Sequence, residues 1–159
     1  MRTIQAEPLT AAAFAPFGEV LEAPQAAGRV YAEDALANGR VEARPSLSFA
    51  RTGPAAALPL EVRLMERHEF SSQSFIPLGR CRWLVVVAPS EPSGGPDAAA
   101  ARAFLAAAGQ GLTYRMNVWH HPLTVLDETA AFAILMWRTG GPGDEEFTEL
   151  PAPFRVALG

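Results

Sequence analysis

A carboxylate and an imidazole lie two residues apart in the segment Glu61–Phe70, which has the composition of a β-strand. Alternate residues of a strand point to opposite faces, so Glu66 and His68 share a face with Val62 and Leu64. A buried, unpaired carboxylate is costly, so this apolar face needs a partner, a polar cavity or a metal ion beside Glu66. The pattern predicts a functional site and a raised pKa for Glu66. The alternative is that both residues close the end of the core and meet water.

Two later segments add candidates. Gln73 lies five residues after His68, and a Pro and a Gly soon follow it, so we expect Gln73 on a strand that returns beside His68. Its amide can bind substrate or fix an imidazole tautomer, and it is equally compatible with an ordinary sheet residue. Residues 117–122 read Asn-Val-Trp-His-His-Pro. The adjacent His120 and His121 face opposite ways on a strand, so at most one shares a cavity with His68.

Composition excludes several classes of function. All 13 basic residues are Arg, so Schiff-base chemistry and a phosphate-loop lysine are impossible. The net charge of -4 argues against a nucleic-acid partner. The lone Cys81 rules out an internal disulfide. No apolar run reaches the roughly 18 residues of a membrane span, and residues 1–16 do not read as a signal peptide, so we expect a cytoplasmic protein with no membrane partner.

The elements that must position these residues are mostly short strands. Thr10 and Gly18 bracket a predicted helix over Ala11–Phe17, and Pro96, Asp97 and Gly109 bracket a second over Ala98–Ala108. The predicted strands are Gly18–Leu21, Ser46–Ala50, Glu61–Phe70, Trp83–Ala88, Val118–Leu126 and Ala130–Trp137. Without a linker or a repeat, residues 1–159 form one domain, and this spacing predicts an all-β sandwich or small barrel with two short helices.

Four motifs together resemble the ureidoglycolate lyase family: Glu-Arg-His at 66–68, Gln-Ser-Phe-Ile-Pro at 73–77, Val-Val-Val-Ala at 85–88, and the residue 117–122 motif. The resemblance covers about residues 1–140. It implies a cupin fold, a double-stranded β-barrel or jelly roll, and a homodimer. It also implies release of urea from (S)-ureidoglycolate, leaving glyoxylate, in allantoin breakdown. The catalytic candidates are Glu66, His68 and His120, and the substrate-binding candidates are Gln73, Asn117 and Trp119.

The resemblance leaves two matters open. In the metal-binding pattern of cupins, Glu66 and His68 stand at the first two His positions, Gln73 at the Glu position and His120 at the late His position, so a divalent metal ion is possible but not required. The family also carries an Arg followed closely by an aromatic residue and a His-Asp pair, and in this chain Pro45-Ser46 replaces that pair. The alternative function is therefore a non-catalytic or altered-substrate cupin that binds a small carboxylate.

Overall fold

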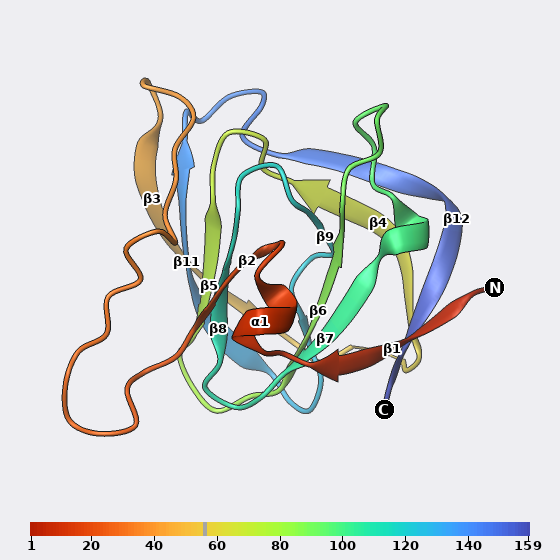
Figure 1. The fold of residues 1–159 in the computed structure, drawn as a ribbon, viewed down its shortest axis with the longest axis horizontal. Coiled ribbons are helices and arrows are strands. Elements are labelled where there is room, and N and C mark those ends of the chain that lie inside the picture. Colours follow the sequence, from red (N-terminus) through yellow and green to blue (C-terminus); the bar gives the residue numbers. More distant parts are fainter. Residues whose placement is uncertain (56) are drawn as a thin grey trace.

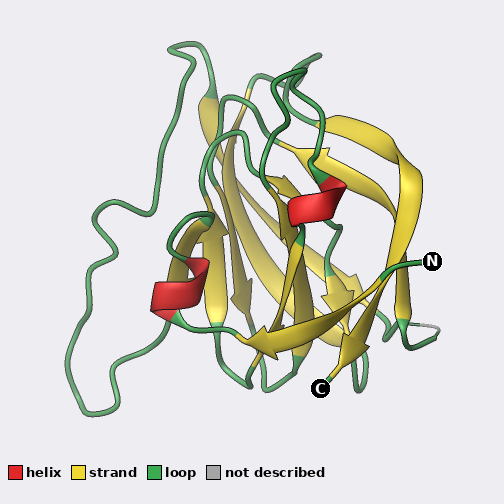
Figure 2. Ribbon diagram, turned by 45° about the vertical axis from the view of Figure 1, so that its right-hand side comes forward, coloured by secondary structure: helices red, strands yellow, loops and turns green. Residues whose placement is uncertain are grey.

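The computed structural model describes residues 1–55 and 57–159, and most of its ordered elements are β-strands (Figures 1 and 2). In chain order the elements are β1 (Thr3–Pro8), α1 (Ala11–Phe14), β2 (Gly18–Leu21), β3 (Arg44–Thr52), β4 (Leu60–Arg67), β5 (Gln73–Pro77), β6 (Trp83–Ala88), the 3-10 turn η1 (Ala98–Ala100), β7 (Arg102–Ala106), β8 (Gly111–Tyr114), β9 (Trp119–His120), β10 (Thr124–Val125), β11 (Ala130–Arg138) and β12 (Glu146–Leu158).

One sheet closes on itself. Its strand order is β10-β6-β7-β1-β12-β4-β9, and β9 pairs back onto β6, so six of its strands form a ring. Apolar side chains fill this ring, among them Val62, Met65, Trp119 and Phe154. The second sheet has the order β2-β8-β5-β11-β3 and packs against the outside of the ring, over a second core that includes Phe104. The result is an all-β, cupin-type barrel, which confirms the predicted fold class.

Strand β6 is the wall shared by the two cores. Trp83, Val85 and Val87 pack in the core between the sheets, whereas Leu84 and Val86 point into the ring. This explains why the segment is apolar at every position instead of alternating, since both of its faces are buried.

The second predicted helix is wrong. The structure has η1 capped by the side chain of Asp97, and then strand β7 in place of a helix through Ala108. In β7 the side chain of Ala103 enters the ring and that of Phe104 enters the other core, so pairing with β6 and β1 overrides the helical propensity of alanine. The first helix forms over Ala11–Phe14 with Thr10 as its cap, shorter than predicted.

A long loop, residues 22–43, leaves β2 and reaches β3 on the left of Figure 1, where it is orange. Its later part is tied to the turn after β4. Ser72 N donates to the carbonyl of Ala37, and Gly39 N donates to that of Phe70. These bonds bring the end of the loop beside the residues that follow His68. No helix among the described residues has the length and apolar character needed to span a membrane.

Candidate active site

Glu66 and His120 face each other across β4 and β9, where they are register partners. Both are buried, and Nε2 of His120 lies 3.1 Å from Oε1 of Glu66. The other ring nitrogen, Nδ1, lies 3.0 Å from the carbonyl oxygen of Val118, which can only accept, so Nδ1 carries a hydrogen. The short contact between Nε2 and Oε1 therefore requires either a proton shared by the two groups or a cation between them.

His68 is the first residue after β4 and is 3% exposed. Its Nδ1 donates to the carbonyl oxygen of Asp144 at 2.8 Å, which leaves Nε2 with a lone pair. Among the described residues nothing hydrogen-bonds that Nε2, although it is buried. The rings of His68 and His120 lie 5.5 Å apart. We call Glu66, His68 and His120 the His–Glu cluster.

Asp144, in the loop between β11 and β12, holds His68 in this orientation. Its buried carboxylate accepts from the guanidinium of Arg40 at 2.7 Å, from the backbone N–H of Thr139 at 2.9 Å and from that of Gly140 at 2.8 Å. These bonds fix the residue whose carbonyl sets the tautomer of His68. Sequence reasoning missed Asp144 and Arg40, because neither lies in a recognisable motif and both come from loops distant along the chain.

Electrostatics sets the charge of the cluster. Burial alone raises the pKa of Glu66, but the hydrogen bond and charge of His120 outweigh it, so the pKa lies below its ordinary value. The prediction of a raised pKa is therefore wrong, because it allowed for burial and not for an imidazole opposite. Burial, helped by the charge of His120, lowers the pKa of His68. Glu66 is thus ionised at neutral pH and His68 is neutral.

The second sheet supplies the opposite wall. Ser46, Met136, Gln73 and Tyr114 are successive register partners across β3, β11, β5 and β8, so they form one row on one face. The Tyr114 ring stacks on His120 at 4.1 Å between centroids, which shows that this row faces the cluster. Burial raises the pKa of Tyr114, so its phenol stays protonated. The sequence analysis missed Tyr114, for which its neighbours along the chain give no signal.

Gln73 belongs to this wall. The prediction that its strand returns beside His68 is wrong, because β5 pairs with β8 and β11 and not with β4. Its Nε2 makes a weak contact with the sulfur of Met136 at 3.8 Å. Its Oε1 is buried without a hydrogen-bond partner in the described part of the chain. An unpartnered buried amide oxygen on the wall facing the cluster fits contact with a ligand.

Asn117 and Trp119 lie on the other side of the sheet. Trp119 is fully buried in the ring, with Arg67 stacked 4.6 Å over its indole. Asn117 adopts a φ of 67°, accepts from Arg67 through its Oδ1, and donates its backbone N–H to the carbonyl of His68. The structure therefore brings these two residues together behind the cluster and not in front of it. His121 also turns away, with its Nδ1 3.1 Å from Oγ1 of Thr124.

The site fits a metal ion. One ligand atom from each of Glu66, His68 and His120 can be chosen so that all lie within 4.8 Å of one another. Nε2 of His68 and Oε1 of Gln73 each carry a lone pair, and no hydrogen-bond donor among the described residues reaches either atom. Two imidazoles, a carboxylate and an amide oxygen are ligands suited to a divalent transition metal.

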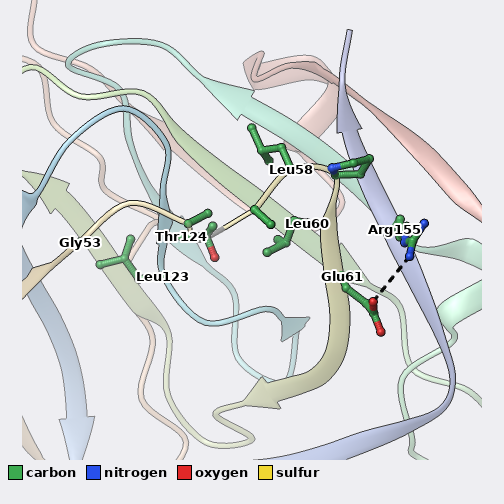
Figure 3. A pocket seen from close by; sticks show the side chains of 10 residues that line it. Gly53, Leu58, Leu60, Glu61, Leu123, Thr124 and Arg155 are labelled. Atoms are coloured by element: carbon green, nitrogen blue, oxygen red, sulfur yellow. Dashed lines mark ion pairs between the residues drawn. The ribbon is translucent and has the colours of Figure 1, made fainter.

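A hollow of about 540 Å³ on the outer surface shares no residue with the cluster (Figure 3). It lies between the segment Leu58–Glu61 and residues 123–124, with Arg155 at its edge. The ion pair between Glu61 and Arg155 spans 4.0 Å, and among the described residues no other acidic or basic side chain lines the hollow. The candidate active site is therefore defined by the buried cluster and not by this hollow.

The fold places this chain among proteins with a cupin-type barrel, and the buried His–Glu cluster lies between its two sheets. The model of the ureidoglycolate lyase family matches residues 1–157. Three relatives named ureidoglycolate lyase are each 41% identical to this chain: one from Chelativorans sp. (strain BNC1) over 99% of this chain and 98% of the relative, one from Burkholderia mallei (strain NCTC 10229) over 90% and 86%, and one from Brucella ovis over 85% and 83%. The chain belongs to the ureidoglycolate lyase family.

Proposed function

We propose that this protein is a lyase that cleaves (S)-ureidoglycolate to glyoxylate and urea. The observation that carries the proposal is the pairing of family membership with a buried cluster in which Nε2 of His68 has no hydrogen-bond partner among the described residues and His120 Nε2 lies 3.1 Å from Glu66 Oε1. The substrate is a hemiaminal with a carboxylate. Its C–N bond breaks when the hydroxyl loses a proton and the urea nitrogen gains one, so the reaction needs a base and an acid.

The cluster supports a role for each residue. His68 is neutral, and its Nε2 is an unpartnered proton acceptor suited to take the hydroxyl proton. In the form without metal, a proton shared by His120 Nε2 and Glu66 Oε1 is suited to pass to the leaving nitrogen. Gln73 Oε1 can accept a hydrogen bond from the ureido N–H groups. Asn117 and Trp119, predicted as substrate contacts, serve in this proposal as supports behind the cluster.

A divalent metal ion is a second form of the same proposal. Glu66, His68 and His120 would hold it, with the amide oxygen of Gln73 as a further ligand. When bound there, such an ion would polarise the hydroxyl oxygen of the substrate as a Lewis acid.

The decisive experiment is urea release from (S)-ureidoglycolate by protein dialysed against chelator, with and without added Ni²⁺, Zn²⁺ or Mn²⁺. We expect urea release. Turnover in the chelated sample would support proton transfer by the side chains alone, and turnover confined to the metal-loaded sample would support the metal form. An absence of turnover in every sample would contradict the lyase proposal.

One observation favours the alternative of an altered substrate. Ser46, part of the segment that departs from the family pattern, lies in the row that faces the cluster. A binding assay with glyoxylate and other small carboxylates would identify this case, since binding without urea release would mark a non-catalytic or altered-substrate cupin.

We propose further that the protein is a cytoplasmic homodimer acting in allantoin breakdown. The single Cys81 suits a reducing compartment. Strand β3 is an edge strand, and its outward face exposes Leu47 (62%) and Phe49 (70%), with Ile76 of β5 on the same face. An apolar strip on a sheet edge is typical of a protein interface.

The dimer is tested by light scattering. We expect about twice the 17.0 kDa of one chain, and a shift to the single-chain mass for Phe49→Glu. Leu58→Glu, which changes an exposed leucine beside the surface hollow, should keep the dimer. A single-chain mass for the unmodified protein would rule out the dimer, and a dimeric Phe49→Glu would move the interface elsewhere.

A further inference from the structure

Two arginines stand opposite each other at the end of the wall that faces the cluster. Arg44 of β3 and Arg138 of β11 are register partners. Each lies two residues from the row of Ser46, Met136 and Gln73, and residues two apart on a strand point to the same face. Both side chains therefore project from the face that lines the site, and both are exposed.

Among the described residues, carboxylates balance the charges of this pair only in part. Like charges directly opposite on a sheet are destabilising. Across residues 1–55 and 57–159, no carboxylate oxygen lies within 4.0 Å of Arg44. Arg138 makes one long contact, from Nε to Oδ2 of Asp144 at 3.6 Å, and the Asp144 carboxylate already accepts from Arg40 at 2.7 Å. Guanidinium donors are thus left over on both residues.

The pair also lies close to the reacting groups. Arg138 contacts the carboxylate of Asp144, and the carbonyl of that same residue accepts from His68 at 2.8 Å. Along the strand, the arginine pair is about 7 Å from the row of Gln73, a distance that an arginine side chain can span.

We propose that Arg44 and Arg138 together bind the carboxylate of a small hydroxy or oxo acid at the end of the wall that faces the His–Glu cluster. This deepens the proposed function and rests on it, since the substrate and the product glyoxylate both carry a carboxylate. A guanidinium binds a carboxylate through two parallel hydrogen bonds, and a bound anion relieves the repulsion between the pair.

The test uses Arg44→Gln and Arg138→Gln, with Arg51→Gln as the matched control. Arg51 lies on the same strand, but at its far end and on the outward face. In urea release, each site variant should raise KM for (S)-ureidoglycolate by about 10- to 100-fold, the worth of a hydrogen bond to a charged group, with a smaller change in kcat. Arg138→Lys should recover part of the loss, because it restores the charge without the paired donors.

A second measurement keeps this proposal separate from the lyase proposal. Glyoxylate binding, followed by calorimetry and by its effect on Tm, should weaken in both site variants and not in Arg51→Gln. Without ligand, Arg44→Gln should keep or raise Tm, because it removes a repulsion. If the unmodified protein releases no urea while glyoxylate binding still depends on both arginines, the lyase proposal fails and the carboxylate site stands. If both site variants match Arg51→Gln in KM and in glyoxylate binding, the carboxylate site is overturned whatever the lyase result.

Discussion

Replacing His68 with Asn should lower urea release from (S)-ureidoglycolate by about 10²–10⁴-fold, the usual contribution of a general acid or base. The amide of Asn can still donate to the carbonyl of Asp144, but the unpartnered Nε2 is lost. Glu66→Gln should have a similar effect, because it removes the charge that faces His120. Thermal stability should hold or rise in both variants, since polar groups gathered in an active site often cost stability.

His121→Asn is the matched control. It removes the imidazole next to His120 in sequence, which turns toward Thr124 and outside the cluster. Its turnover should stay within a few-fold of the unmodified protein. A purely structural role for His68 predicts the reverse pattern: Tm falls by several degrees, since about 1 kcal/mol shifts Tm by roughly 2–8 °C in a domain of this size, while turnover per folded molecule is unchanged.

Replacing Asp144 with Asn should lower kcat by about 10- to 100-fold, the usual effect of disturbing a residue that orients a ligand or catalytic group. Asp144 acts as a positioning residue: its carboxylate is fixed by Arg40 and the turn at 139–140, and its carbonyl fixes His68. Asn is close in size but loses the charge that holds Arg40.

Proton NMR tests whether Asp144 orients His68 or only stabilises the fold. The Nδ1 hydrogen of His68 is protected by its bond to Asp144, so its signal should be slow to exchange in the unmodified protein and fast in Asp144→Asn. A variant that lost stability but kept both this signal and its kcat per folded molecule would contradict the role.

The stability contribution of Asp144 has a defined pH range. Burial raises the pKa of Asp144, but its hydrogen bonds with Thr139, Arg40 and Gly140 outweigh burial and hold the pKa below its ordinary value. A carboxyl whose pKa is lowered by folding stabilises the fold above its unfolded pKa of about 3.9 and loses that contribution as the pH falls through its folded pKa. The Tm difference between the unmodified protein and Asp144→Asn should thus be steady from pH 7 to about 5 and shrink below about 4.

Local sequence patterns predicted a strand correctly where pairing with distant segments does not override the local preference. Gly18–Leu21 and Trp83–Ala88 coincide with β2 and β6. The prediction failed at residues 98–108, because the decisive interaction of β7 is pairing with strands far away in the chain, which composition does not report. For the same reason the predicted strand Val118–Leu126 appears as two short strands, β9 and β10, that pair with different positions of β6.

In the candidate site, too, the sequence predicted what depends on one strand and missed what depends on distant segments. Alternation placed Glu66 on a buried face, because that property belongs to one strand. It also grouped Glu66 with Val62, which is wrong: Val62 packs inside the ring with Met65, because the pairing of β12 with β4 shifts register between these residues and breaks the alternation. The partners of the cluster, Asp144 and Tyr114, come from a loop and from the other sheet, so no local pattern contains them.

The position of β3 at the edge of its sheet bears on how this family diversifies. A residue there has one neighbouring strand, β11, so a proline such as Pro45 is tolerated at little cost to the ladder. Ser46 on the same strand nevertheless lines the site. Glu66, by contrast, is paired on both sides, with His120 and with Phe147. Substitutions that alter substrate preference can therefore accumulate along β3 during evolution. A substitution at Glu66 is less easily tolerated, because it must remain compatible with pairing to β9 and to β12.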